Sequence, residues 1–189
     1  MSKLKQIKYI IKNIVAIFIV AMFFSCANTS GEVRDFLADK NLPIGISREV
    51  YNVYTDSGRV TSKLKTPLLL NFSNREKHPY AEFPDGVKVI SFDKKNDSTV
   101  VVGDYAIIYN ETNISEIRGN VVITNNSQNK ILTTDQLFWD QKTKYFYTEK
   151  PFVLYSLLDT IYGEGLDASQ DLSKFTAKRN RGVLNLKED

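Results

Sequence analysis

The sequence predicts an all-β domain, a sandwich, roll or barrel, behind an N-terminal targeting segment. The chain of 189 residues is divided into short runs rich in Val, Ile, Thr and aromatic residues, as half-buried strands require. Clusters of Asp, Asn, Gly and Ser separate these runs, and no long stretch repeats with the 3.6-residue period of a helix. With 42% hydrophobic residues, the chain is able to bury a core and has the composition of neither a disordered nor a multi-span membrane protein.

The amino-acid composition argues against several kinds of metal site and catalytic chemistry. The single cysteine excludes an internal disulfide and any multi-cysteine zinc or iron–sulfur site, and the single histidine argues against most histidine-based catalysis. The net charge is +3, but residues 1–25 contain four of the basic residues, namely Lys3, Lys5, Lys8 and Lys12. Without these four, 21 basic residues face 22 acidic ones, so the basic balance belongs to the targeting segment.

Residues 1–25 have the composition of a secretory signal. A basic start is followed by an uninterrupted apolar run, Ile14–Phe24, and then by Ser25 and Cys26. The placement of the only cysteine resembles a bacterial lipoprotein signal, which predicts cleavage before Cys26 and lipid attachment to it. The alternative is an uncleaved membrane anchor, although the run is shorter than the about 20 apolar residues that span a bilayer. Either reading tethers the rest of the chain to a membrane, outside the cytoplasm.

Three segments follow the signal. We expect a linker over residues 26–48, a β domain over residues 49–186 and a tail over residues 187–189. The linker contains a short helix at Glu32–Asp39, which the following Asn-Leu-Pro sequence ends. The clearest strand runs of the β domain are Tyr51–Tyr54, Val87–Ile90, Thr99–Val102, Val121–Ile123 and Tyr145–Tyr147.

A weak internal repeat runs through the β domain. Asp104, Asp135 and Glu164 each follow two strand residues and a small residue, and an apolar position comes shortly after each. The spacings are 31 and 29 residues. A pair of strands cannot bury its apolar face alone, so stacked units of this kind predict one continuous apolar interior.

Motifs for catalysis or metal binding are weak. His78 lies in a polar, loop-like stretch, no Gly-x-Ser-x-Gly sequence is present, and the acidic residues are scattered over turns. Asp93, Asn96 and Asp97 lack the later glycine and glutamate of a calcium loop and indicate a hairpin tip. A C-terminal basic group fits either a solvated strand face or contact with phosphorylated headgroups or an acidic partner: Lys174, Lys178, Arg179 and Arg181. No metal, cofactor or nucleic acid is predicted as a ligand.

Five short motifs follow one another between Tyr51 and Leu184: Asp56-Ser57-Gly58, Ile117-Arg118-Gly119-Asn120-Val121, Leu132 to Asp140, Thr148 to Val153, and Ile161 to Asp167. In the order and spacing of these motifs the sequence resembles the LptC family, the periplasmic component of the lipopolysaccharide export machinery. The resemblance implies a curved β-jellyroll of antiparallel strands, open along one side, without enzymatic activity. The better-known members keep an N-terminal membrane helix, whereas this chain has Cys26 after a short apolar run.

An open jellyroll turns its inward row of side chains into an apolar trough for acyl chains, each buried CH₂ contributing about 0.8 kcal/mol. Alternation along the strands selects twelve candidates for this row: Leu64, Val100, Val102, Ile107, Val122, Leu132, Leu137, Trp139, Phe146, Val153, Ile161 and Leu166. The same residues are also those that would pack against one another in a closed core, and alternation does not separate the two cases.

The resemblance also implies partners. Lipopolysaccharide would pass from an inner-membrane ABC transporter, through the trough, to a periplasmic LptA-like bridge protein. The early strands, Tyr51–Leu70, and the late strands, Ile161–Leu184, would pair edge to edge with these proteins, on the periplasmic face of the inner membrane. The chain has no ATP site, so the energy would come from a partner.

The main alternative is a cell-envelope lipoprotein of another class. In that case a closed β-sandwich would bind glycan or protein through surface aromatics, with Trp139 on an exposed face. A glycan hydrolase is a more distant alternative and would need two carboxylates close together in a cleft.

Overall fold

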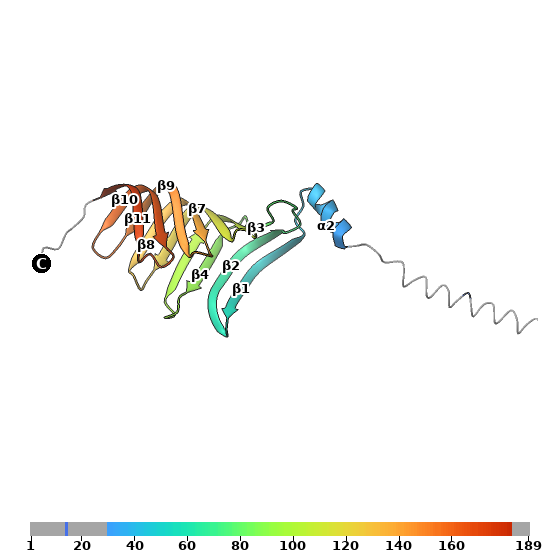
Figure 1. The fold of residues 1–189 in the computed structure, drawn as a ribbon, viewed down its shortest axis with the longest axis horizontal. Helices are drawn as coiled ribbons and strands as arrows, with labels where there is room; N and C mark the ends of the chain where they lie inside the picture. The colour runs from blue at the N-terminus through green and yellow to red at the C-terminus, as the bar shows by residue number, and fades with distance from the viewer. Residues whose placement is uncertain (1–13, 15–29, 183–189) are drawn as a thin grey trace, which may run out of the picture. The chain divides into compact units, whose positions relative to one another are not determined.

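A computed structural model describes Ile14 and residues 30–182, and the chain divides into two compact units, Met1–Phe36 and Leu37–Asp189. Helix α2 spans Ser30–Asp39. Within the described residues, eleven antiparallel strands form one curved sheet (Figure 1): β1 Gly45–Asp56, β2 Arg59–Phe72, β3 Tyr80–Phe83, β4 Val87–Phe92, β5 Ser98–Gly103, β6 Tyr105–Tyr109, β7 Ile114–Asn125, β8 Lys130–Asp140, β9 Tyr145–Tyr155, β10 Thr160–Ser169 and β11 Phe175–Gly182.

The sheet is a meander in which strands that follow one another in the sequence pair in space. β3 and β4 both pair with β2, at different parts of its length, and act as two halves of one strand. β5 and β6 form the next such pair of halves, with β5 beside β4 and β6 beside β3. The first half of β7 pairs with β6 and its second half with β5, after which β8 to β11 follow in order. Among the described strands, only β1 and β11 have a single neighbour, and they are the two edges of the sheet.

The long strands bend near their middles, where the pairing register shifts at Arg118–Val121, Thr134–Phe138 and Glu164–Leu166. These bends coincide with the internal repeat, since Asp104 separates β5 from β6, and Asp135 and Glu164 lie at register shifts. The bends divide the sheet into two half-sheets. Half-sheet A consists of β4, β5 and residues 50–66, 121–134, 151–163 and 179–182; half-sheet B consists of β3, β6 and residues 69–72, 114–118, 137–148 and 166–177.

Two glycines make the bends possible. Gly119 has φ +73° at the β7 bend, and a Cβ there would lie 2.9 Å from Oδ2 of Asp104. Gly163 allows close approach instead, because its Cβ would lie 2.6 Å from the carbonyl oxygen of Arg179 and 2.7 Å from the ring of Phe152. A side chain at Gly163 would force the neighbouring strand to move, whereas at Gly119 it would strain the backbone and displace the Asp104 side chain.

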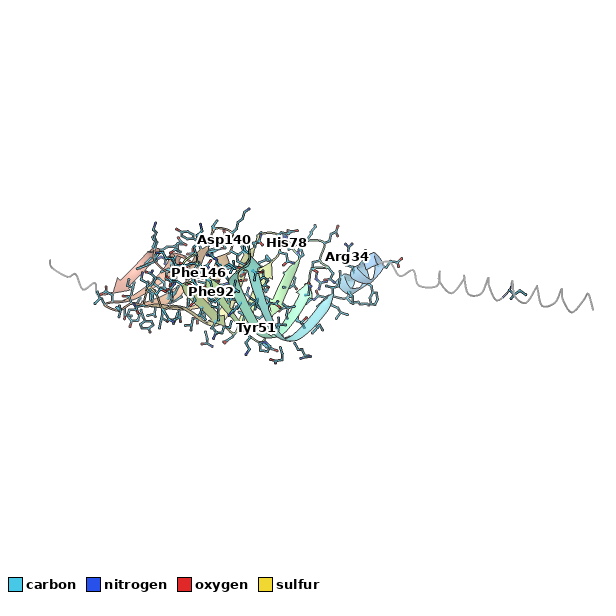
Figure 2. All side chains as sticks on the ribbon, turned by 90° about the horizontal axis from the view of Figure 1, so that it is seen from below. Arg34, Tyr51, His78, Phe92, Asp140 and Phe146 are labelled. Carbon is cyan, nitrogen blue, oxygen red and sulfur yellow. The ribbon has the colours of Figure 1, made fainter. Side chains whose placement is uncertain are left out.

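The inner faces of the two half-sheets pack against each other and form one core. In half-sheet A, the paired strands align one apolar row across the sheet, namely Leu64, Val89, Val101, Ile123, Leu132 and Leu154. In half-sheet B, the corresponding buried row contains Phe83, Ala106, Ile117, Leu137 and Leu166. Figure 2 shows Phe146, also of half-sheet B, among the strands, and Tyr51 of β1 at the margin of the sheet.

At the β11 end the core is filled around Leu172, and a more polar pocket of about 240 Å³ remains between the tips of half-sheet A and residues 169–171. The β10–β11 loop inserts Leu172, 1% exposed, between the half-sheets. Lys130, at the tip of half-sheet A, donates a hydrogen bond of 2.8 Å to the carbonyl oxygen of Leu172 and lies 5.3 Å from the ring of Phe175. Separation of the half-sheets at this end therefore requires this contact to break.

The predicted all-β class and the curved, open antiparallel sheet are confirmed, as are the five strand runs and the short helix before them. Asp93 and Asp97 lie at the β4–β5 hairpin, as expected, where Oδ1 of Asp93 accepts two backbone N–H bonds of 2.8 Å. Apart from Ile14, the predicted signal lies outside the described residues, as does Cys26. In the part of the chain that is described, no helix has the length and apolar character needed to cross a bilayer.

Candidate lipid-binding cavity

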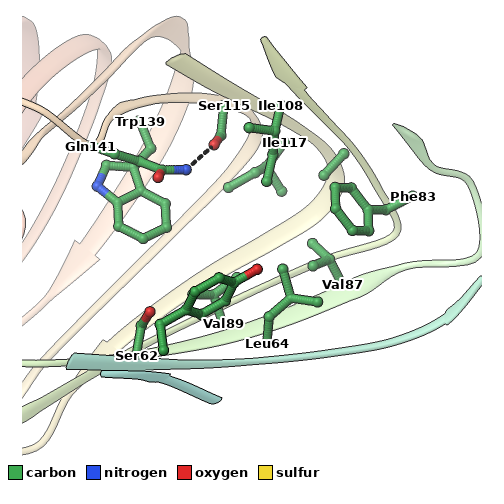
Figure 3. A pocket seen from close by; sticks show the side chains of 12 residues that line it. Ser62, Leu64, Phe83, Val87, Val89, Ile108, Ser115, Ile117, Trp139 and Gln141 are labelled. Carbon is green, nitrogen blue, oxygen red and sulfur yellow. Dashed lines mark hydrogen bonds between the residues drawn. The ribbon is translucent and has the colours of Figure 1, made fainter. Parts of the chain in front are cut away.

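At the β1 end, the half-sheets enclose a cavity of about 200 Å³ in place of a filled core (Figure 3). Both half-sheets supply its apolar walls: Leu64, Val87 and Val89 from A, and Phe83, Ile108, Ile117 and Trp139 from B. Each of these side chains points inward because the strand alternation places its neighbours on the outer face. The cavity is an apolar space of the kind that accepts hydrocarbon without directional contacts.

Polar groups surround the entrance to this cavity. Tyr54 of β1 is half exposed there, next to Ser62 of β2. On the opposite side, Nε2 of Gln141 donates a hydrogen bond of 2.7 Å to Oγ of Ser115, as Figure 3 shows. A ligand at this entrance would meet hydroxyl and amide groups before the apolar walls.

The polar entrance continues as a row across half-sheet A. Strand pairing aligns Tyr54 with Ser62, then with Ser91, Thr99 and Asn125, all on the inner face near the strand tips. Nδ2 of Asn125 donates a hydrogen bond of 2.9 Å to Oγ1 of Thr99. The next row inward is the apolar row of the core, so the interior is amphipathic, with polar groups at the tips and hydrocarbon beneath them.

The twelve residues predicted for the trough divide between the two faces of the sheet. Six lie in the buried core, Leu64, Leu132, Leu137, Trp139, Phe146 and Leu166, and Ile161 packs against it. Of these seven, only Leu64 and Trp139 line the cavity, because the others lie where the interior is filled.

The inward orientation predicted for the other five residues is wrong: Val100, Val102, Ile107, Val122 and Val153 lie on the outer face. Val101 is 1% exposed whereas Val102 is 40% exposed, so the alternation of β5 has the opposite phase. The error arose because both faces of these strands are apolar, which removes the hydrophobic contrast that normally assigns a face.

Of the twelve residues that line the cavity, sequence reasoning missed all but Leu64 and Trp139. The largest side chains it missed include Tyr54, Phe83, Ile108 and Ile117. Phe83 directly precedes the turn Pro84-Asp85-Gly86, a local signal for the end of a strand. The others come together only through pairing of β1, β6 and β7 with strands distant in the sequence, and no local pattern encodes that register.

The remaining candidate groups show no reactive arrangement. His78 is 82% exposed in its side chain, with Nδ1 3.9 Å from Oε2 of Glu111. Lys178 pairs with Glu149 and Asp167, and Arg179 lies 3.6 Å from Glu164, so these two basic residues belong to an ion-paired strand surface. Among the described residues, no group of three or more His, Cys, Asp or Glu side chains is arranged to hold a metal ion.

One buried charge stabilises half-sheet B from its outer face. Glu116 of β7 is 6% exposed in its side chain and accepts two hydrogen bonds of 2.7 Å from Arg118, and another from Gln136. The bonds from Arg118 hold the pKa of the Glu116 carboxyl below its ordinary value. This cluster ties β7 to β8 directly behind the cavity wall formed by Ile117.

We expect Arg118→Ala to lower the free energy of unfolding by about 2 kcal/mol at neutral pH, because it leaves the Glu116 carboxylate buried without its cation. The contribution is complete above the unfolded pKa of about 4.3 and is lost as pH falls through the lower folded pKa. Urea unfolding should therefore show a smaller difference from wild type near pH 3 than at neutral pH. Arg179→Ala, which removes an exposed ion pair, is the control and should change stability little. An equal effect of both substitutions would contradict the assignment.

Comparison with known families agrees with this architecture. The family model described as "Lipopolysaccharide-assembly, LptC-related" matches residues 14–184, which is most of the chain. The chain belongs to the LptC family. Members of this family are non-enzymatic components of lipopolysaccharide transport, which places the protein with the export machinery in the cell envelope. No curated protein sequence matches the chain significantly.

The LptC resemblance is thus confirmed over a longer segment than Tyr51–Leu184. The alternative of a closed β-sandwich with Trp139 on its surface is not supported, since Trp139 is 7% exposed and its indole lies 5.7 Å from the ring of Phe146 in the interior.

Proposed function

We propose that this LptC-family protein receives lipopolysaccharide from the inner-membrane ABC transporter and passes it to an LptA-like periplasmic bridge protein. The observation that supports this most strongly is the cavity between the half-sheets at the β1 end, with apolar walls and a polar entrance. An acyl chain in the cavity would gain about 0.8 kcal/mol for each buried CH₂. Its polar headgroup would remain at the strand tips, beside Tyr54, Ser62 and Gln141.

The two sheet edges support a direction for this transfer. β1 begins 20 residues after the predicted targeting segment, so we assign its free edge to the membrane-embedded transporter. The β11 edge lies at the other end of the meander and is assigned to the bridge protein. Because Leu172 fills the interior at the β11 end, transfer requires the Lys130–Leu172 contact to open. We also propose that Cys26, or an uncleaved N-terminal segment, holds the domain on the periplasmic face of the membrane.

Photo-crosslinking tests the cavity as the lipid site. We expect p-benzoylphenylalanine in place of Tyr54 to form an adduct with lipopolysaccharide in cells that export it, because this side chain lies at the cavity entrance. The matched control is the same replacement at Tyr145, which is exposed to a similar extent (45% against 49%) but alternates with the inward Phe146 and so faces outward. Immunoblots for lipopolysaccharide would report the adducts. Adducts at Tyr145 and none at Tyr54 would sink the transport proposal.

A further inference from the structure

The outer face of half-sheet A is unusual for a solvent-exposed sheet. Strand pairing aligns two rows of side chains across it, one from Tyr51 of β1 to Tyr162 of β10 and one from Val53 to Thr160. In a sheet with one solvated face, polar residues on that face normally alternate along each strand with apolar residues that face the core. Most positions in these two outer rows instead carry a β-branched aliphatic residue or a tyrosine. This apolar outer face is also the reason that the sequence pattern did not show which residues of β5 point inward.

Exposure shows that this face is not covered by the rest of the described chain. Val102 is 40% exposed, Ile131 41%, Tyr155 43% and Tyr162 52%. At the strand tips the β9–β10 hairpin adds two leucines that are still more exposed, Leu157 at 77% and Leu158 at 65%. Contiguous apolar exposure of this kind on a soluble domain marks a contact surface.

The charges in these two rows have a single sign. The rows contain three basic residues, Lys63, Lys65 and Lys88, and no Asp or Glu. The acidic residues around them lie outside the rows, at the bend (Asp104 and Asp135) and at the strand tips (Asp56, Asp93, Asp97 and Asp159). Lys63 also lies 5.6 Å from the ring of Phe92, which keeps its ammonium group over the same face. The complementary surface must therefore be apolar and anionic.

We propose that the outer face of half-sheet A docks on the surface of an anionic lipid bilayer. Tyrosines and lysines beside aliphatic side chains are the residues that settle at a membrane–water interface, with rings at the headgroup level and ammonium groups on the phosphates. Leu157 and Leu158, on a hairpin tip, would enter the boundary of the acyl chains. This contact is independent of the cavity, which opens on the inner face of the same strands.

Tryptophan fluorescence of the full chain, reconstituted into lipid vesicles, tests this orientation. The sequence contains one tryptophan, Trp139, which lines the cavity, so its quenching is measured in the unsubstituted chain with the same vesicles and subtracted. We expect the indole introduced by Tyr155→Trp to be quenched by brominated lipid in vesicles of phosphatidylcholine and phosphatidylglycerol, and much less in phosphatidylcholine alone. The control is Tyr145→Trp, since Tyr145 lies at the other end of β9, in half-sheet B, with nearly equal exposure (45% against 43%).

The lysines provide the second arm of the test. Replacing Lys63, Lys65 and Lys88 together by glutamine should shift the equilibrium between docked and free domain by roughly 100-fold, because each lysine near an anionic surface contributes about a fivefold preference. Quenching at position 155 should then fall to the level seen with neutral lipid. Equal quenching at positions 145 and 155, or in both kinds of vesicle, would overturn the proposal. Absence of quenching at 155 in anionic vesicles would overturn it as well and leave a protein partner for this face.

Discussion

Ser62→Trp is expected to stop lipopolysaccharide export while leaving the protein folded. Ser62 lies on the inner face of β2 at the cavity entrance, so an indole at this position would occupy the space proposed for an acyl chain. Excluding only two CH₂ groups costs about 1.6 kcal/mol of binding, which already exceeds the 1.4 kcal/mol that corresponds to a tenfold loss. We therefore expect export to fall by at least about tenfold, measured as lipopolysaccharide that reaches the cell surface.

The matched control for this substitution is Ser98→Trp. Ser98 lies in β5 next to the inward Thr99 and so places the same indole on the outer face. Both variants should unfold at nearly the wild-type temperature, since one indole enters an existing cavity and the other faces solvent. If Ser62→Trp folds and still exports at the wild-type rate, the cavity is not the lipid path. If both variants lose export, the loss is not specific to the cavity.

The sequence was sufficient for the fold class because strand and turn signals are local. The turn residues Asp93 to Asp97, for example, act through hydrogen bonds to their own neighbours, and they fold as the predicted hairpin tip. The repeat around Asp104, Asp135 and Glu164 was also visible, and it marks the points where the strands bend. Each of these features depends only on residues close together in the chain.

The cavity was less predictable because it depends on the pairing register of distant strands and on which part of the interior other side chains fill. Leu64 and Leu132 belong to one cross-strand row, yet Leu64 borders the cavity while Leu132 is fully buried in packed core. The difference comes from Leu172, which the β10–β11 loop inserts at the far end of the interior only. Val100 and Val102 were assigned to the wrong face because the outer face of β5 is apolar too, so hydrophobicity does not show which residues of the strand point inward. Conflicting local signals of this kind are expected at surfaces that bind a partner.

A proline scan of two adjacent residues, Asn52 and Val53, should separate the free edge of β1 from its paired edge. Successive residues of a strand point their N–H groups to opposite sides, and among the described strands β1 has only β2 beside it. One proline therefore removes a donor of the β1–β2 ladder and costs roughly 3 kcal/mol of stability. The other removes a donor that only an added strand would use and leaves the fold intact.

We expect this second variant to show the larger functional effect. Lost pairing and the bulk of the proline ring at the edge should weaken association with the transporter by at least about tenfold. Thermal unfolding identifies which of Asn52→Pro and Val53→Pro keeps the wild-type stability, and co-purification with the transporter then measures its association. Wild-type association in the stable variant would show that β1 does not join the transporter by strand pairing. Alanine at the same position removes the side chain and keeps the backbone donor, so it is the matched control. If the alanine variant retains the transporter and the proline variant loses it, the junction lies on that edge of β1.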